Sequence, residues 1–412
     1  MLFLDAATSP HHRTSATHHL EVHVIKLPAS RTPYCWKDTF GKTELCEISL
    51  TPSEKLDPDA NPLFAVTALD RALLSGFLYD AQHRLAYNHS EESQLVGTGD
   101  AAPATREMSG NLVWLCHDGG ASAPTLYGLG AGNQLLQFPE PVKDATSGQM
   151  TRATGTPVHY TIPMDGAPYV VDCAIAPWRD GGNKLQTMVA ITRNHWSQNG
   201  HSEDYTTLIV TTLEAIHHSD FANTRGLMPS VKFDYPLGWV AIAPDAASVW
   251  VTPITTYHFG NGEKCKNAYR VHVEGNKLVV KTFTVKSGIV CGRVAFQCDD
   301  QNKLWAAVPV DTGLALLAAH ANPSSEIKYI DAKDMYGDDS WTMPGSHNTV
   351  WTLRNADFNQ HEDPRRTLWQ RLTQWDLGTG TVKCNGLLPP GKAPCKSDSD
   401  KDRWYRDFGV AP

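Results

Sequence analysis

The sequence predicts an all-β protein built from repeated four-stranded sheets, and two observations carry this prediction. The first is composition: the 412 residues include 41% hydrophobic and 19% charged residues, with 31 Gly and 26 Pro. Such a composition is typical of a folded chain rich in turns. The second is a recurring phrase of four short apolar segments separated by polar turns. Self-similarity with a period on the order of fifty residues indicates a repeat architecture.

The clearest copy of the phrase covers residues 238–285, where GWVAIAPD, ASVWVTPI, AYRVHVEGN and KLVVKTFTV follow one another. Each piece has the length and the β-branched content of a strand, and the Glu-Gly-Asn between the last two is a hairpin signal. Further copies cover residues 169–237, 292–332 and 340–388, and looser copies cover 63–99 and 110–141. The segments HLEVHVIKL, ELCEISLTP and RWYRDFGV near the two ends complete a seventh copy.

Four short antiparallel strands per copy predict a β-propeller, because each small sheet has apolar faces that only neighbours in a ring can cover. We expect a single propeller of six or seven four-stranded blades over residues 21–412, closed by N- and C-terminal strands, and a flexible His-rich tail over residues 1–20. A pair of β-sandwiches is the alternative. It gives no reason why Trp250, Trp305 and Trp351 each open the second strand of a copy.

Ring closure brings the two ends of the chain into one blade. We expect a strand near residues 403–410 to pair with one near residues 22–27 or 45–50, because these segments are left over from the six internal copies. A blade that takes strands from both ends holds the ring against opening.

The segment LTQWDLGTGTV, residues 372–382, resembles the third-strand end of a WD40- or kelch-type propeller blade, where Trp-Asp and a Thr-Gly turn recur. The segment occurs once, and the Gly-His partner usual in WD40 blades is missing. The resemblance therefore implies a divergent propeller and transfers no function, since propellers host binding modules, lectins and enzymes.

Three swollen links between the second and third strands of a copy carry the candidate binding residues. The links span residues 192–205, 254–269 and 354–366. Because they occupy the same place in the copy, we expect them on one face of the ring, where scaffolded loops concentrate binding residues. Each link holds His and aromatic side chains, and the candidates are His195, Trp196, Tyr257, His258, Phe259, Phe358 and His361.

Catalytic and metal-binding motifs are missing from the sequence. It has no nucleophile elbow, no phosphate-binding loop, no dinucleotide fingerprint and no Cys-x-x-Cys pair. The predicted job of Asp172, Asp245, Asp299 and Asp300 is to cap turns between strands. We therefore expect a protein without catalytic activity, cofactor or metal.

Charge and cysteine content limit the partners and the compartment. The net charge of −8 disfavours nucleic acid, and no apolar run is long enough for a membrane helix. We expect a cytoplasmic monomer. The alternative is a secreted protein whose leader precedes residue 1, in which Cys35 with Cys46 and Cys384 with Cys395 form disulfides.

The function predicted from these features is binding of a protein or peptide by a non-catalytic scaffold. Aromatic and His side chains on a rigid ring suit the central contacts of an interface. A carbohydrate-binding, lectin-like propeller is the first alternative, since exposed aromatic rings stack on sugars, and a hydrolase or lyase with a central site is the second. The residues at the central ends of the first strands discriminate between scaffold and enzyme.

Overall fold

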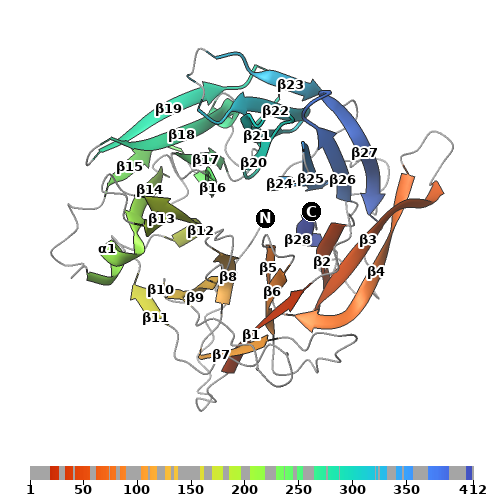
Figure 1. The fold of residues 1–412 in the computed structure, drawn as a ribbon, viewed down its shortest axis with the longest axis horizontal. Coiled ribbons are helices and arrows are strands. Elements are labelled where there is room, and N and C mark those ends of the chain that lie inside the picture. Colours follow the sequence, from red (N-terminus) through yellow and green to blue (C-terminus); the bar gives the residue numbers. More distant parts are fainter. Residues whose placement is uncertain are drawn as a thin grey trace.

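The sheets of the protein are arranged around a common centre in a propeller-like manner, as the computed structural model shows (Figure 1). Side chains are described mainly between residues 172 and 388. The described residues are 19–26, 33–39, 42–55, 62–73, 75–79, 84–89, 104–109, 112–117, 126–130, 134–137, 158–161, 169–179, 185–195, 205–218, 229–235, 237–244, 248–253, 264–274, 277–286, 288–320, 322, 325–331, 340–345, 348–355, 370–388 and 405–410.

Four sheets of four antiparallel strands follow the chain order strictly, and three of them lie between residues 169 and 331. Their strands are β12 (Tyr169–Arg179), β13 (Leu185–His195), β14 (Tyr205–Thr212) and β15 (Ser230–Phe233); β16 (Leu237–Ile242), β17 (Val249–Pro253), β18 (Asn267–Glu274) and β19 (Lys277–Thr284); β20 (Ala295–Cys298), β21 (Leu304–Val310), β22 (Gly313–Ala318) and β23 (Lys328–Asp331). These sheets confirm the strand pattern predicted for residues 169–237, 238–285 and 292–332.

The fourth of these sheets is formed by β8 to β11, and an eight-stranded sheet contains two runs of four strands. The former holds β8 (Leu112–His117), β9 (Leu126–Gly130), β10 (Gln134–Gln137) and β11 (Val158–Thr161). The latter has the order β24 (Ser340–Pro344), β25 (Thr349–Asn355), β26 (Gln370–Asp376), β27 (Thr381–Leu388), β4 (Pro62–Leu73), β3 (Lys42–Lys55), β2 (Pro33–Thr39) and β28 (Tyr405–Val410). A single parallel residue pair, Leu387 with Leu63, joins the two runs.

The last sheet has an order that the sequence repeats do not predict. Its strands lie in the order β5 (Ser75–Tyr79), β6 (Arg84–His89), β1 (His19–Lys26) and β7 (Ala104–Ser109). The predicted copy over residues 63–99 is therefore wrong as a single sheet, because β4 belongs to the sheet of β3 and the N-terminal strand β1 lies between β6 and β7.

The C-terminal strand β28 pairs with the N-terminal strand β2, with Cys35 opposite Phe408 and Lys37 opposite Tyr405. Both strands lie near the centre of the molecule (Figure 1). The expected direct partners of β28, residues 22–27 or 45–50, are wrong: the former lie in the sheet of β1, and the latter lie in β3, one strand beyond β2. The expected tail, residues 1–20, lies outside the described residues except for the first two positions of β1.

Helical structure within the described residues is limited to α1 (Leu213–His218) and the 3-10 turn η1 (Lys264–Lys266). The all-β prediction is thus confirmed. The helix α1 follows β14 directly, and the hydroxyl of Thr212 caps its first turn by accepting a hydrogen bond from the backbone N–H of Ala215 at 3.2 Å. No helix in the described part is long and apolar enough to cross a membrane.

The core is divided among the contacts between neighbouring sheets. In β21 the side chains alternate: Ala306, Val308 and Val310 pack against the sheet of β16 to β19, whereas Trp305 and Ala307 pack toward the sheet of β24 to β27. This period of two is what a strand buried on both faces requires. Within the described core, from β12 to β27, each sheet therefore covers the apolar face of its neighbour.

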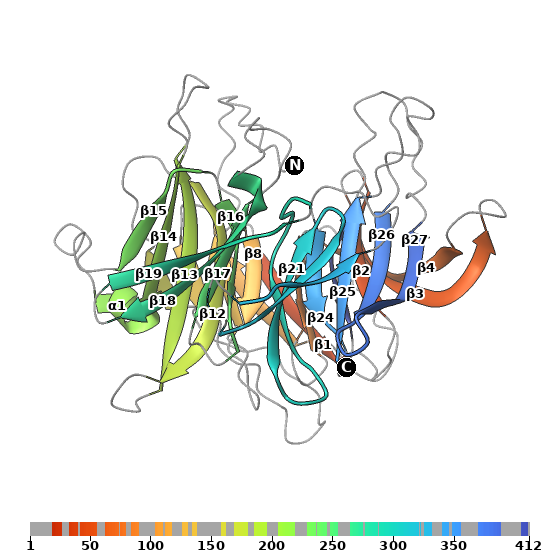
Figure 2. The ribbon, with the colours of Figure 1, turned by 90° about the horizontal axis from the view of Figure 1, so that it is seen from above.

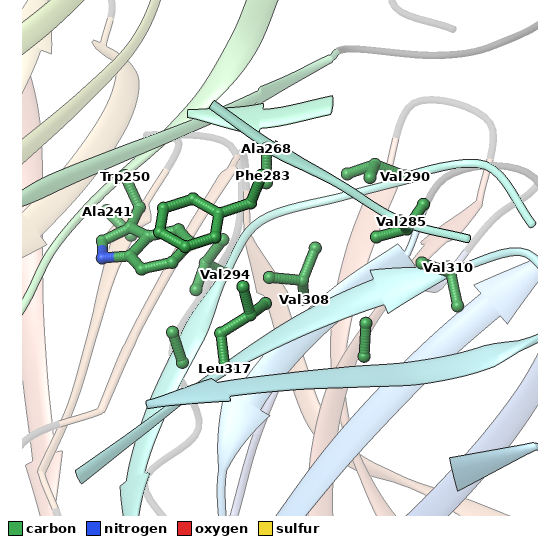
Figure 3. Packing of buried hydrophobic residues seen from close by; sticks show 12 residues of the cluster. Ala241, Trp250, Ala268, Phe283, Val285, Val290, Val294, Val308, Val310 and Leu317 are labelled. Atoms are coloured by element: carbon green, nitrogen blue, oxygen red, sulfur yellow. The ribbon is translucent and has the colours of Figure 1, made fainter. Parts of the chain in front are cut away.

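Trp250 is the largest side chain in the first of these contacts (Figure 3). Its fully buried indole stacks on Phe283, with ring centroids 5.2 Å apart, and meets the edge of Phe296 at 6.5 Å. Such aromatic pairs add to the stabilisation from area burial. Trp250 therefore fills the contact between the sheets of β16 to β19 and β20 to β23.

The three predicted tryptophans hold equivalent positions. Trp250, Trp305 and Trp351 each lie two residues after the residue whose carbonyl closes the hairpin between first and second strand, namely Ser248, Lys303 and Thr349. Only Trp305 meets an acidic acceptor, donating from Nε1 to Asp299 at 2.8 Å. The residues equivalent to Asp299 are Ala243 and Gly345, which carry no acceptor side chain.

Candidate functional site

The three long links follow the C-terminal ends of β13, β17 and β25. Asp172 of β12 lies opposite Thr192, and Trp239 of β16 lies opposite Thr252, so the first two hairpins share a register at this end. Second strands of successive antiparallel sheets run in the same direction, and Figure 2 shows β13, β14, β25 and β26 running between two opposite rims. We call the rim where β13, β17 and β25 end the link rim.

Most of the predicted site residues lie outside the described residues. His195 is the last residue of β13 and lies opposite Tyr205 of β14. The backbone of His195 is therefore at the link rim. The other six candidates, Trp196, Tyr257, His258, Phe259, Phe358 and His361, belong to link segments that the structure does not describe, so their shared face stays a prediction.

Threonines near the ends of the second strands bind the next sheet. The hydroxyl of Thr192 donates to the carbonyl of Gly238 at 2.9 Å, and that of Thr252 donates to the carbonyl of Gly292 at 2.6 Å. Both threonines are fully buried. Because the two bonds are equivalent, they place Trp239 and Arg293, the residues that follow the two glycines, at corresponding positions of consecutive sheets.

Asp172, Trp239 and Arg293 form a cluster that spans three sheets, and we call it the axial cluster. Arg293 Nη2 donates to Asp172 Oδ1 at 2.6 Å, and the guanidinium carbon lies 5.6 Å from the centroid of the Trp239 ring. The ion pair bridges from the sheet of β12 to the segment before β20, passing the sheet of β16 that lies between them. It therefore joins sheets that are not neighbours in the chain.

Asp172 is a buried strand residue, so the prediction that it caps a turn is wrong. It is 2% exposed and lies at a register shift between Val170 and Asp172 of β12. Its Oδ2 accepts a hydrogen bond from the backbone N–H of Val240 at 2.9 Å. Burial raises the pKa of Asp172 above its usual value, although the charge of Arg293 and the N–H of Val240 act in the opposite direction.

Asp299 and Asp300 lie on the opposite rim, between β20 and β21. Asp299 Oδ1 accepts from the backbone N–H groups of Gln301 and Lys303, both at 2.9 Å, which confirms its predicted role as a turn cap. Asp300 Oδ2 accepts instead from Asn348 Nδ2 of the neighbouring sheet at 3.2 Å. The fourth predicted cap, Asp245, lies outside the described residues.

A buried arginine holds the start of the third link. Arg354 near the end of β25 is 1% exposed and donates to the carbonyls of Val310 at 2.5 Å and of Gly313. Its guanidinium carbon lies 5.8 Å from the Trp375 ring centroid. Burial lowers the pKa of Arg354 from its usual value. Arg354 thus fixes the strand end that precedes Phe358 and His361 against the sheet of β20 to β23.

The structure bears on both cysteine pairs that the sequence offers as disulfides. Cys384 is a free thiol, so the Cys384–Cys395 disulfide that belongs to the secreted alternative is not formed. Cys35 and Cys46 lie directly opposite each other on β2 and β3. Within the described residues, no group of three or more His, Cys, Asp or Glu side chains lies close enough to hold a metal ion.

Sequence reasoning missed Trp239 and Arg293, although a signal for them was present. The phrases GWVA (238–241) and GRVA (292–295) repeat Gly, Val and Ala while the second residue varies. The constant positions are explained by packing and by the threonine–carbonyl bonds, and the variable position is the one in the axial cluster. A repeat position that changes chemistry while its neighbours stay constant was the usable signal.

No family model matches the sequence, and no curated protein does. Among solved structures, the chain is similar to apo AztD from Citrobacter koseri, with 8% identity, coverage of 89% of this chain and 82% of that chain, and a TM-score of 0.40. A second crystal structure of Citrobacter koseri AztD gives 7% identity, 93% and 85% coverage and a TM-score of 0.39. Hydrazine synthase from Kuenenia stuttgartiensis gives 12% identity over 52% of this chain, a TM-score of 0.32, and the chain spans about half the length of that protein, 48%.

Proposed function

We propose that the chain is a non-catalytic binding or scaffold protein that binds a protein or peptide at the link rim. The observation that carries the proposal is the common register of the hairpins that lead into the long links. Rigid sheets that present several long links at one rim offer a large surface at little ordering cost.

The engagement of Asp172 favours binding over hydrolase or lyase chemistry at the centre. Both of its oxygens accept hydrogen bonds, one from Arg293 and one from Val240, and the carboxylate is buried. A general acid or base must reach the substrate proton, usually at hydrogen-bond distance. The carboxylate of Asp172 serves instead to orient Arg293 and the backbone of β16.

The proposal includes a closed ring of seven four-stranded blades of a divergent WD40- or kelch-like type. Two features support it: a single residue pair joins the two halves of the eight-stranded sheet, and β28 completes the half formed by β2 to β4. The Trp375–Asp376 segment also behaves as a blade element, since Trp375 Nε1 donates to Thr352 Oγ1 at 2.8 Å and Asp376 accepts from Gly378 and Thr379.

Removal of residues 403–412 tests ring closure. The truncation deletes β28 and exposes the edge of β2, so we expect the melting temperature to fall by several degrees, on the order of 1–3 kcal/mol in stability, or soluble expression to be lost. Differential scanning calorimetry of the full and truncated chains measures the effect. Equal melting temperatures would show that β28 does not hold the ring.

Loop variants test the binding function. Affinity capture from an extract of the native host identifies a partner, whose dissociation constant is then measured with Trp196→Ala, Phe358→Ala and Gln301→Ala. We expect each of the first two to weaken binding by about 1 kcal/mol or more, roughly fivefold, with little change in stability. Gln301 is exposed on the opposite rim and serves as the control.

Two outcomes would contradict the proposed function. If both loop variants bind the partner as tightly as the unmodified chain, the link rim is not the binding surface. If no protein partner is recovered while a glycan array gives specific hits, the carbohydrate-binding alternative replaces the proposal.

A further inference from the structure

Cys35 of β2 and Cys46 of β3 occupy directly opposite positions on neighbouring antiparallel strands. Opposite residues of an antiparallel pair have Cα atoms about 4.5 Å or about 5.5 Å apart, depending on whether they exchange backbone hydrogen bonds. Disulfides in proteins span Cα separations of about 4.4–6.8 Å. The backbone therefore places the two cysteines at a separation that a disulfide bridges without moving either strand.

The register that makes the two cysteines opposite is fixed by a short connection. Thr39 is paired with Lys42, so only two residues separate the end of β2 from the start of β3. From this pair the ladder runs without a shift to Tyr34 opposite Glu47. A two-residue connection sets the register of a hairpin through its turn geometry. The opposition of the cysteines is thus built into the hairpin itself.

The ladders on the outer sides of this hairpin are less regular. The pairing of β2 with β28 shifts between Cys35 and Trp36, and that of β3 with β4 shifts between Glu44 and Cys46. A register shift leaves a residue unpaired and disrupts the ladder locally. Both cysteines therefore lie beside an interrupted ladder, where backbone hydrogen bonds alone hold their strands less firmly.

Across the paired strands that the structure describes, this is the one place where two cysteines lie opposite each other in the register. Elsewhere a strand cysteine is paired with another residue type: Cys116 with Tyr127, Cys173 with Ile191, Cys298 with Leu304 and Cys384 with Gln374. The last three of these cysteines are free thiols. The opposed pair is therefore a feature of one hairpin and not of the repeat.

We propose that Cys35 and Cys46 form a reversible disulfide that locks β2 onto β3 and thereby holds the C-terminal strand β28. Among the described pairings, β28 is bound through β2 alone. The bond blocks any opening in which β2 leaves β3 and takes β28 with it. Because the bond depends on the register, it does not require that the chain is secreted, and it is independent of the proposed binding function.

A small disulfide such as oxidised glutathione is the oxidant. The thiolate of one cysteine attacks a sulfur of the small disulfide, forming a mixed disulfide and releasing one small thiolate. The thiolate of the second cysteine then attacks the protein sulfur of the mixed disulfide and releases the other small thiolate. Two electrons pass from the cysteine pair to the small disulfide, and the two protons of the cysteine thiols end on the released thiolates. Excess small thiol reverses the same steps.

Peptide mapping of the full-length folded chain tests whether the bond forms. The chain is equilibrated with oxidised glutathione or with an excess of reduced glutathione, its remaining thiols are alkylated, and it is digested with trypsin. Cleavage after lysine and arginine yields one peptide of residues 32–37 and another of residues 43–55, each with one of the two cysteines. We expect the two peptides to be joined in the oxidised sample and separate in the reduced one.

A urea-unfolded sample separates the effect of the fold from closeness in the sequence. Cys35 and Cys46 are near each other along the chain, so an unfolded chain also joins them to some extent. If the register drives the pairing, the joined fraction should be higher in the folded chain than in the unfolded chain at the same ratio of oxidised to reduced glutathione. Equal fractions would overturn the argument from the register.

Matched variants connect the bond to stability and to β28. Oxidation should raise the melting temperature of the unmodified chain by about 3 °C, the size expected for closing a short loop in a chain of this length. It should also slow hydrogen exchange at the backbone amides of β28. Cys35→Ser should lose both effects, whereas Cys298→Ser, which removes a free thiol of another sheet, should keep both. Cys46→Ser repeats the comparison if Cys35→Ser does not fold.

The outcomes divide cleanly. An oxidised, folded chain without the joined peptides, or with Cys35 joined to a different cysteine, overturns the disulfide. A joined pair that changes neither the melting temperature nor hydrogen exchange in β28 overturns its role in holding the C-terminal strand. Neither result bears on binding at the link rim, which is measured with separate variants.

Discussion

Asp172 and Asp299 lie at opposite rims, and their carboxylates are accommodated in different ways. Asp172 is buried within β12, where it accepts hydrogen bonds from one cation and one backbone N–H. Asp299 lies in the turn after β20 and gathers two backbone N–H groups and the indole of Trp305. The same residue type therefore ties together distant sheets in one place and shapes a single hairpin in the other.

The two environments move the pKa of the carboxyl group in opposite directions. For Asp172, burial is the largest influence and raises the pKa. For Asp299, burial also acts to raise it, but the hydrogen bonds from Trp305, Lys303 and Gln301 together lower the pKa. A carboxylate that collects donors at a surface turn is stabilised in its charged form, whereas one buried with a single cation is not fully compensated.

The largest expected effect comes from breaking the Asp172 pair. Arg293→Met leaves an ionised carboxylate in a buried site, so the free energy of unfolding at pH 7 should fall by about 3 kcal/mol. Urea denaturation measures the change. The double variant Asp172→Asn with Arg293→Met removes both charges and should recover most of the loss. A loss below about 1 kcal/mol in the single variant would show that the pair contributes little to the fold.

A smaller effect is expected at the turn. Asp299→Ala removes the acceptor of three hydrogen bonds at a partly exposed site, and the free energy of unfolding should fall by about 1–2 kcal/mol. Gln301→Ala in the same turn contributes only its backbone N–H and should change the stability by less than about 0.5 kcal/mol. Equal losses in the two variants would mean that the side chain of Asp299 does not organise the turn.

The smallest effect is a difference in pH dependence, and its sign distinguishes the two sites. Because the pKa of Asp172 is raised in the folded state, stability relative to Asp172→Asn should be highest below the ordinary value of 3.8 and decline as the pH rises through the folded pKa. Because that of Asp299 is lowered, stability relative to Asp299→Asn should be present above 3.8 and decline as the pH falls through the folded pKa. Urea unfolding from about pH 3 to 7 tests both, and slopes of the same sign would contradict the comparison.

The fold was predictable where each sheet is built from consecutive strands. In residues 238–285 the predicted pieces coincide with β16 to β19, because the apolar period of two and the Glu-Gly-Asn turn are local signals. The sheet of β5, β6, β1 and β7 was not predictable in this way. Glu21 pairs with His89 and with Glu107, and no local pattern in the sequence encodes pairings at such separations.

For the candidate site, the sequence predicted only the rim on which the long links begin. The long links follow from counting residues between strands, but the axial cluster depends on how two first strands, β12 and β16, and the segment before β20 meet. The prediction that Asp172 caps a turn failed because β12 extends over eleven residues and includes Asp172. The irregularity between Val170 and Asp172 depends on pairing with β13, which no local pattern encodes. Arg293 precedes β20 and belongs to no predicted loop, so length and polarity gave no indication of its role.

The pairing of β28 with β2 sets an order of events during synthesis. Strand β2 ends at Thr39 and its partner begins at Tyr405. At 5–20 residues per second, the ribosome needs on the order of tens of seconds to make the intervening chain. Throughout that time β2 presents an unpaired edge, the kind of surface on which chains join one another and on which chaperones act. The edge of β2 therefore stays open to aggregation until β28 is made.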